Sequence, residues 1–127
     1  CTFHPSVRYG RRVRLESVDN AVEQARTAAS NICGRTATHA HVPWFWSDQY
    51  DLKLQIAGLS QGYDQTVLRG DPDTSKFALY YFAQGELIAV DAINSPKDFM
   101  TGKKWIAERK HPDPVKLADL TADLKTL

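Results

Sequence analysis

The sequence has few cysteines, no long apolar run and no marked excess of either charge. Its 127 residues include 16 lysines and arginines against 15 aspartates and glutamates, which gives a net charge of +1. This balance argues against a general role in binding polyanions. No apolar run approaches the roughly 20 residues that a helix needs to cross a bilayer. The composition, 43% hydrophobic and 24% charged, is instead ordinary for a globular domain.

Cysteine is represented only by Cys1 and Cys33. Two cysteines are too few for a disulfide framework, and their spacing fits no zinc motif. A reducing, cytoplasmic setting is therefore expected. The chain begins with a cysteine rather than a methionine and carries no signal-peptide pattern, so we expect it to be a fragment of a longer protein.

The residue patterns of a complete active site are also missing. The glycines mark turns rather than a phosphate-binding loop, and no serine lies in a nucleophile elbow. His39 and His41 are two residues apart in a predicted coil, while His4 and His111 lie far from them in sequence. Because no second ligand pair has a useful spacing, solvated loop histidines are predicted rather than a metal site. Any active site would have to be completed by other parts of a larger protein.

An arginine-rich run, RYGRRVR, covers residues 8 to 14. It has the composition of a phosphate-contacting arm, which keeps a DNA- or RNA-binding module open as an alternative. Glu16 and Asp19 follow at once, however, and no helix-turn-helix, zinc finger or aromatic RNA-binding motif accompanies the run. An exposed basic face is favoured, with docking of an acidic partner protein as a third use.

Residues 17 to 33, SVDNAVEQARTAASNIC, are predicted to form a helix. Small apolar residues recur at helical spacing, namely Val18, Ala21, Val22, Ala25, Ala28, Ala29 and Ile32. Ser17 is a suitable N-cap, and Gly34 can adopt the left-handed conformation that ends a helix. A stripe made mostly of alanine should lie close against a neighbour. We expect that neighbour to be the chain's own C-terminal domain, another copy, or a helix exchanged between copies.

A polar connector at residues 34 to 43 separates this helix from a second region, and the domain boundary is placed there. Alternating apolar residues predict a half-buried strand at 52 to 56. A shorter strand is predicted at 66 to 70, and a hairpin with the turn AQGE at 76 to 93.

Helices are predicted to follow the strands. Ser95 and Pro96 provide an N-cap and a first-turn proline for a helix that runs to about Arg109. The segment HPDP breaks this helix, and residues 115 to 127 are predicted to form a weaker helical tail. The predicted fold class is α+β, a mainly antiparallel sheet with C-terminal helices, preceded by one N-terminal helix.

Three segments of the chain resemble one known family. They are RYGRRVRLESVDNAVEQARTAASNI, VPWFWSDQYDLKLQIAGLSQGYDQTVLRG and LIAVDAINSPKDFM. Together they are similar to the C-terminal third of the FAD-dependent ferredoxin reductases that serve oxygenases and cytochromes P450. That group includes the putidaredoxin, rubredoxin and biphenyl-dioxygenase ferredoxin reductases. The resemblance implies that residues 1–36 end an FAD-binding domain and that residues 42–127 form the reductase C-terminal α+β domain.

The resemblance also implies where the cofactor lies. Glu16, Ser17 and Val18, at the predicted helix start, would face the pyrimidine edge of FAD. The positive end of the helix dipole would favour the negative charge that reduction leaves there. Trp46 would lie against the isoalloxazine region with Trp44 nearby, because a flat aromatic surface suits stacking. Phe45, between them, is expected to anchor an interdomain seam.

The implied reaction passes electrons from NAD(P)H through FAD to a ferredoxin or rubredoxin. Ferredoxins are acidic, so Arg11, Arg12 and Arg14 are expected to steer them. Neither glycine-rich nucleotide-binding fingerprint of the family occurs in the chain, so the fragment alone is expected to be inactive. The alternatives are an autonomous protein-interaction or dimerisation module and, less favoured, a basic nucleic-acid binder.

Overall fold

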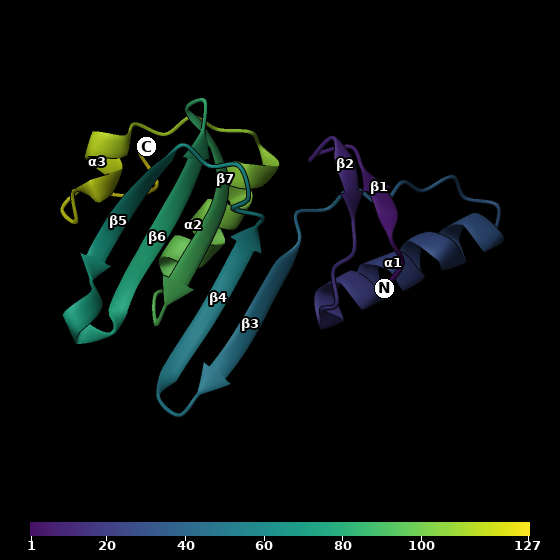
Figure 1. Ribbon diagram of the computed structural model, residues 1–127, viewed down its shortest axis with the longest axis horizontal. Coiled ribbons are helices and arrows are strands. Elements are labelled where there is room, and N and C mark those ends of the chain that lie inside the picture. Colours follow the sequence, from purple (N-terminus) through teal and green to yellow (C-terminus); the bar gives the residue numbers. More distant parts are fainter. The chain divides into compact units, whose positions relative to one another are not determined.

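The computed structural model describes residues 1–127, which divide into two compact units (Figure 1). Unit 1 comprises Cys1–Phe45 and unit 2 comprises Trp46–Leu127. No helix in either unit is both long enough and apolar enough to span a lipid bilayer.

Unit 1 contains a small two-stranded antiparallel sheet and one long helix. Strands β1 (His4–Ser6) and β2 (Arg11–Val13) pair with each other, and α1 (Val18–Ile32) follows. The predicted helix is confirmed at both ends. The Ser17 side chain accepts a hydrogen bond from the amide of Asn20, and Gly34 adopts a φ of +77° just beyond the last turn. The β1–β2 pair is not evident in the sequence, because each strand has only three residues.

The apolar stripe of α1 is not covered by the rest of unit 1. Every member of the stripe is exposed, and Val18 and Ile32 retain 62% and 86% of their accessible surface. Unit 1 therefore does not cover the stripe, and packing of the stripe on the C-terminal domain stays a prediction. Instead, α1 turns its polar face toward its own unit, where Gln24 accepts a hydrogen bond from the amide of Thr2 at 2.9 Å. Contact of the stripe with another copy or another domain stays a prediction.

Unit 2 is built on an antiparallel sheet, and its strands run in the order β3-β4-β7-β6-β5. The strands are β3 (Trp44–Gln49), β4 (Leu52–Gly58), β5 (Gln65–Asp71), β6 (Lys76–Ala83) and β7 (Glu86–Ile93), with a short 3-10 turn at Pro72–Thr74. The predicted strands and the β6–β7 hairpin are confirmed. Residues 44–49 also form a strand, β3, which was not predicted from the sequence, and the aromatic residues in it have a high preference for strands.

Helix α2 (Pro96–Ala107) covers one face of this sheet, and α3 (Pro114–Ala118) packs beside β5 (Figure 1). Alternate residues of β6, among them Tyr80 and Phe82, are fully buried beneath α2. Gly102 permits this close approach, since a Cβ at that position would lie 2.6 Å from Cγ1 of Val90. The α+β fold class is thus confirmed.

The predicted helical tail is only partly present. Helix α3 ends at Ala118, and turns form most of the chain from there to Leu127. Asp113 caps α3 by accepting hydrogen bonds from the amides of Val115 and Lys116. Aspartates that follow close their own turns, as Asp119 does with Thr121, and such local bonds compete with helix formation.

Candidate functional site

The aromatic residues of β3 lie at the division between the two units. Trp44 and Phe45 end unit 1, and Trp46 begins unit 2. Trp44 is half-buried, whereas Phe45 is exposed and Trp46 keeps 39% of its surface accessible. An exposed tryptophan is costly in water and is typical of a binding surface.

The start of α1 offers backbone donors to an anion. The cap by Ser17 satisfies the amide of Asn20, so the amides of Val18 and Asp19 have no partner within the helix. The side chains of Glu16 and Val18 are both exposed. A helix of 15 residues also places the positive end of its dipole here. The residues expected to face the cofactor are therefore accessible at the helix start, and their role stays a prediction.

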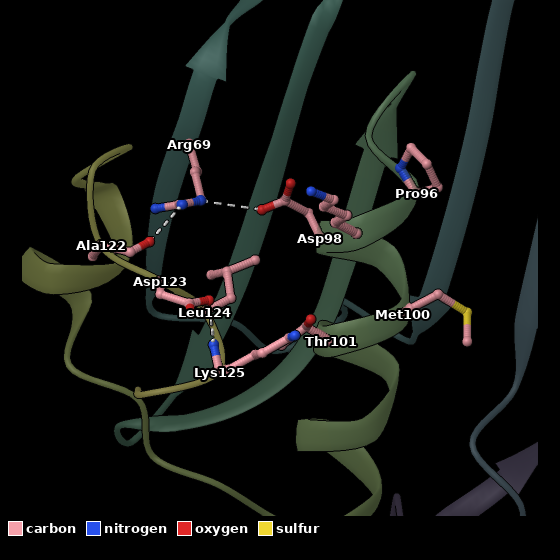
Figure 2. A pocket seen from close by; sticks show the side chains of 10 residues that line it. Arg69, Pro96, Asp98, Met100, Thr101, Ala122, Asp123, Leu124 and Lys125 are labelled. Carbon is pink, nitrogen blue, oxygen red and sulfur yellow. Dashed lines mark hydrogen bonds and ion pairs between the residues drawn. The ribbon is translucent and has the colours of Figure 1, made fainter.

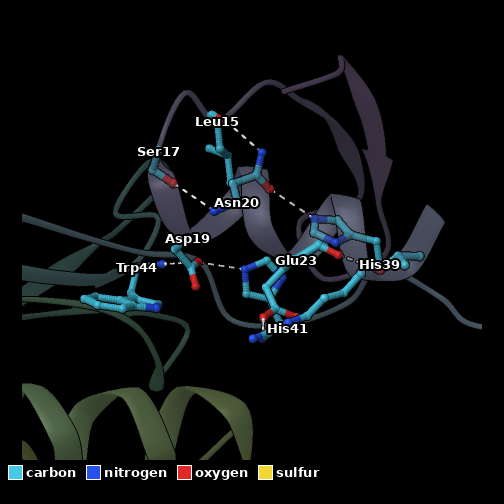
Figure 3. Close-up of polar contacts among 10 residues, drawn as sticks. Leu15, Ser17, Asp19, Asn20, Glu23, His39, His41 and Trp44 are labelled. Atoms are coloured by element: carbon cyan, nitrogen blue, oxygen red, sulfur yellow. Dashed lines mark hydrogen bonds and ion pairs between the residues drawn. The ribbon is translucent and has the colours of Figure 1, made fainter. Parts of the chain in front are cut away.

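Asp19 links this helix start to the aromatic strand (Figure 3). One of its carboxylate oxygens, Oδ2, accepts a hydrogen bond from the backbone amide of Trp44 at 3.3 Å. The same oxygen lies 2.8 Å from Nε2 of His41. Its carboxylate is almost fully buried, with 9% of the side-chain surface accessible. Sequence reasoning recognised only the negative charge of Asp19 in the first helical turn.

Three histidines gather beside this carboxylate. The ring of His39 lies 4.8 Å from the ring of His4 and 4.8 Å from the ring of His41, centroid to centroid, in edge-on contacts. The expectation of solvated loop histidines is wrong for His39 and His41, which are half-buried. Strand β1 brings His4 next to the connector, a contact between distant residues that spacing in the sequence cannot reveal.

The histidine cluster disfavours extra positive charge. Burial lowers the pKa of His39, and the neighbouring His41 and His4 lower it further, against a smaller opposing effect of Glu23 and Asp19. Nε2 of His39 lies 3.1 Å from Oδ1 of Asn20 (Figure 3). At neutral pH the ring of His39 is therefore neutral and hydrogen-bonded to the helix.

Asn20 anchors the whole arrangement from inside. It is fully buried, and its side-chain amide donates to the backbone oxygen of Leu15 at 2.7 Å. Its two side-chain atoms thus connect His39 to the segment that leads into α1. No group of three or more His, Cys, Asp or Glu side chains in residues 1–127 is arranged to hold a metal ion.

The three arginines expected to bind a partner are all exposed, but they are not equivalent. Arg12 donates to the backbone oxygen of Phe3 at 2.6 Å and lies over the Phe3 ring at 4.9 Å. It therefore also stabilises the β1–β2 pair. Arg11 and Arg14 flank it on an accessible surface. The structure keeps these three side chains within one short segment, and their binding role stays a prediction.

A second polar centre lies in unit 2 (Figure 2). Arg69 is almost fully buried and donates to the backbone oxygens of Leu117, Asp119 and Ala122, and its Nε lies 3.3 Å from Oδ1 of Asp98. Asp98 also accepts from the hydroxyl of Tyr80 at 2.8 Å. Burial, and then the adjacent carboxylate, raise the pKa of the Tyr80 phenol.

This centre lies at the edge of an open groove of about 710 Å³ between α2 and the C-terminal segment. Arg69 fastens that segment to β5, since all three backbone oxygens it binds belong to residues after Pro114. The arrangement is a structural tie rather than a reactive site. Sequence reasoning missed it, because a single arginine in a short strand carries no sign of a partner 48 residues away.

Comparison with known proteins identifies the region. Residues 44–127 match the reductase C-terminal family. The chain is 48% identical over 118 residues to the ferredoxin reductase subunit of 5,5'-dehydrodivanillate O-demethylase from Sphingobium sp., which covers 93% of this chain and 29% of that relative. It is 41% identical over 125 residues to putidaredoxin reductase CamA of Pseudomonas putida, covering 98% of this chain and 29% of the relative.

Solved structures of ferredoxin reductases are also similar to this chain. The ferredoxin reductase for the CYP199A2 system from Rhodopseudomonas palustris is 41% identical, superposes with a TM-score of 0.93, and is matched over 99% of this chain and 31% of that one. The reductase in a covalent putidaredoxin reductase–putidaredoxin complex is 42% identical with a TM-score of 0.89, over 94% of this chain and 29% of that one. The chain thus spans less than a third of the length of the relatives that it matches.

Proposed function

Because this chain belongs to the reductase C-terminal family, we propose that it is the C-terminal part of an FAD-dependent NAD(P)H:ferredoxin reductase. One observation carries the proposal: residues 44–127 match that family, and the chain is close in sequence to several ferredoxin reductases. The parent protein would pass electrons from NAD(P)H to a ferredoxin or rubredoxin that supplies an oxygenase or cytochrome P450. Two free, exposed cysteines suit the reducing, cytoplasmic setting of such a protein.

The start of α1 fits the proposed role in holding FAD. Glu16, Ser17 and Val18 would lie along the pyrimidine edge of the flavin, where the amides of Val18 and Asp19 would donate to it. Bound FAD supplies the chemistry that accepts two electrons at once and releases them singly. The exposed stripe of α1 supports the same proposal, because it is the kind of surface that another part of an FAD-binding domain would cover.

Trp44 and Trp46 would exclude water from the flavin. An indole offers a large flat surface for stacking, and its N–H still finds an acceptor at the edge of a pocket. The exposure of Trp46 fits a side chain whose partner is a cofactor rather than the protein core. Phe45 is proposed to anchor an interdomain seam, since it follows Trp44 on the opposite side of the strand.

The fragment and its parent should differ completely in activity. We expect the 127-residue chain to bind no stoichiometric FAD and to oxidise no NADH, since it holds only one edge of the cofactor site. Preceded by an upstream segment that carries two G-x-G-x-x-G motifs, it should yield a yellow protein that reduces a ferredoxin. FAD absorbance and ferredoxin-dependent cytochrome c reduction measure the two properties. A tight yellow complex of the fragment alone would contradict the proposal.

The proposed partner surface is the arginine segment. Arg11 and Arg14 are the informative residues, because Arg12 also supports the hairpin through Phe3. In the parent reductase, the double change Arg11→Gln and Arg14→Gln should slow electron transfer to an acidic ferredoxin and weaken its dependence on salt. Direct reduction of ferricyanide should be unchanged. A rate that does not vary with ionic strength in the unmodified protein would argue against electrostatic steering.

A further inference from the structure

The carboxylate of Asp19 joins segments that are far apart in sequence. Asp19 lies in the first turn of α1, His41 lies in the connector, and Trp44 begins the aromatic strand. Oδ2 accepts from the Trp44 amide at 3.3 Å and lies 2.8 Å from Nε2 of His41. A hydrogen bond to a buried carboxylate is stronger than one between neutral groups. One oxygen atom therefore sets the distance between the helix start and Trp44.

The helix start is itself held firmly. Ser17 caps the amide of Asn20, and the buried side chain of Asn20 donates to the backbone oxygen of Leu15 at 2.7 Å. These bonds fix the turn that carries Asp19. A carboxylate in a fixed turn can determine where its partners lie, whereas a carboxylate on a mobile loop would follow them.

We propose that Asp19 is a positioning residue for Trp44, and that added protons on the histidine cluster weaken this hold. The inference rests on the proposed function, because it concerns the tryptophan expected near FAD. Asp19 would not touch the reacting atoms. It would set the place of the Trp44 backbone, and with it the direction in which this side chain projects.

The histidine cluster is the part of this network that responds to protons. His39 is surrounded by His41 of the connector, His4 of β1, and Asp19, Asn20 and Glu23 of α1. A proton added to His39 places a positive charge against the rings of His41 and His4, which disfavour it more than Glu23 and Asp19 favour it. The connector carries both His39 and His41, so its displacement would pull Trp44 away from Asp19.

The ring of His41 is held by a single hydrogen bond. Nδ1 of His41 is buried and has no hydrogen-bond partner, so the hydrogen bond of this ring is the one to Asp19. His41 lines a small hollow of about 10 Å³, together with His4, Arg8, Tyr9 and His39. A space of that size suits a single water molecule among polar groups. Loss of the contact with Asp19 would therefore free the ring of His41 and loosen the connector between His39, which contacts Asn20, and Trp44.

Amide hydrogen exchange on the 127-residue chain tests the proposal without flavin or ferredoxin. In Asp19→Ala, exchange at the Trp44 amide should accelerate roughly tenfold or more, because a charge-assisted hydrogen bond is lost. The amide of Thr27, in the middle of α1, should change far less. Asp19→Asn should show an intermediate acceleration, since it keeps an acceptor without the charge. Asp73→Ala, in an exposed turn of unit 2, is the matched control.

The pH profile supplies the second readout. Exchange at Trp44, corrected for its intrinsic pH dependence, should accelerate in the unmodified chain between pH 7 and 5.5, and His39→Gln should suppress this change. Equal acceleration of the Trp44 and Thr27 amides in Asp19→Ala would overturn the proposal, since that result indicates only loss of a helix-dipole interaction. An unchanged Trp44 amide would overturn it as well.

The same substitution in the parent protein distinguishes a failure of this inference from a failure of the proposed function. Suppose that Asp19→Ala accelerates exchange at the Trp44 amide in the chain and yet leaves the flavin spectrum of the FAD-loaded parent unchanged. That pair of results would mean that Asp19 positions Trp44 and that the placement of Trp44 near FAD is wrong. If the parent binds no FAD at all, the proposed function fails while the exchange result remains valid.

Discussion

The two units of this chain are stabilised in different ways. Unit 2 buries a continuous apolar core between its sheet and α2, including Tyr80, Phe82 and Ile106. Unit 1 buries few apolar side chains, among them Val13, and depends instead on hydrogen bonds around the buried Asn20. Apolar burial stabilises in proportion to area, whereas a hydrogen bond adds only about 1 kcal/mol. Unit 2 is therefore stabilised mainly by its apolar core, and unit 1 mainly by its polar network.

Their helices show the same difference. Helix α2 buries Phe99, Trp105 and Ile106 against the sheet, and the single buried residue of α1 is Asn20. Both helices are amphipathic, but only α2 has its apolar side covered within its own unit. A helix without such a neighbour gains little from its pattern, because helical stability in proteins comes mainly from packing. The comparison supports the proposal that α1 belongs to a larger domain.

The largest effect should come from the core of unit 2. Phe82→Ala should lower the free energy of unfolding by about 3–5 kcal/mol, since Phe82 is fully buried and its removal leaves a cavity. Guanidinium denaturation followed by circular dichroism measures the loss. Leu68→Ala, at an exposed position of the neighbouring strand β5, should stay within about 0.5 kcal/mol. Similar losses for both variants would show that unit 2 lacks the core described here.

The second-largest loss of stability should come from Arg69, which ties β5 to the C-terminal segment. Arg69→Met should cost about 3 kcal/mol, because it leaves Asp98 as a buried charge without its cation. It should also expose the segment after Ala118 to proteolysis, because the backbone oxygens of Leu117, Asp119 and Ala122 lose their donor. Arg109→Met is the control: its contact with Glu86, at 3.7 Å, is exposed and worth less than about 1 kcal/mol.

Unit 2 was more predictable from the sequence than unit 1, for a physical reason. The strands and α2 repeat apolar residues with a period that reflects the core on which they pack, so this period predicts each element from the sequence. The strand β3 was missed because its aromatic residues face several directions and its Trp46 is exposed. In the tail after Ala118, aspartate turns replaced the predicted helix.

The polar network of unit 1 could not be derived from spacing. Asp19 and Trp44 are 25 residues apart, and His4 reaches His39 only because β1 folds back along the connector. The helix cap at Ser17 was predictable, because it depends on residues three positions apart. The roles of Glu16 and the tryptophans came from family resemblance, and they stay predictions until a structure with FAD tests them.

A smaller effect on stability is expected from His39, which should make the free energy of unfolding of unit 1 depend on pH. The pKa of His39 is lowered in the folded chain, so the unfolded chain takes up this proton first as the pH falls. Stability should therefore decline below the ordinary value of 6.5, until the pH passes the lowered pKa of the folded state. His39→Gln should flatten this decline in urea titrations at pH 7.5, 6.5 and 5.5. His111→Gln, at an exposed site of unit 2, should leave the slope unchanged.

The smallest effect on stability is expected from the exposed stripe of α1. Ala25→Glu should change the free energy of unfolding by less than about 0.5 kcal/mol, because Ala25 is exposed in the middle of the helix. The same change should abolish any self-association through the stripe, which sedimentation velocity would detect as a shift to monomer. In the parent reductase it should impair FAD incorporation, because a charge would be buried where α1 meets the rest of the FAD-binding domain. A parent that tolerates the substitution would mean that the stripe faces solvent in the complete protein, and unit 1 would then be stabilised by its polar network alone.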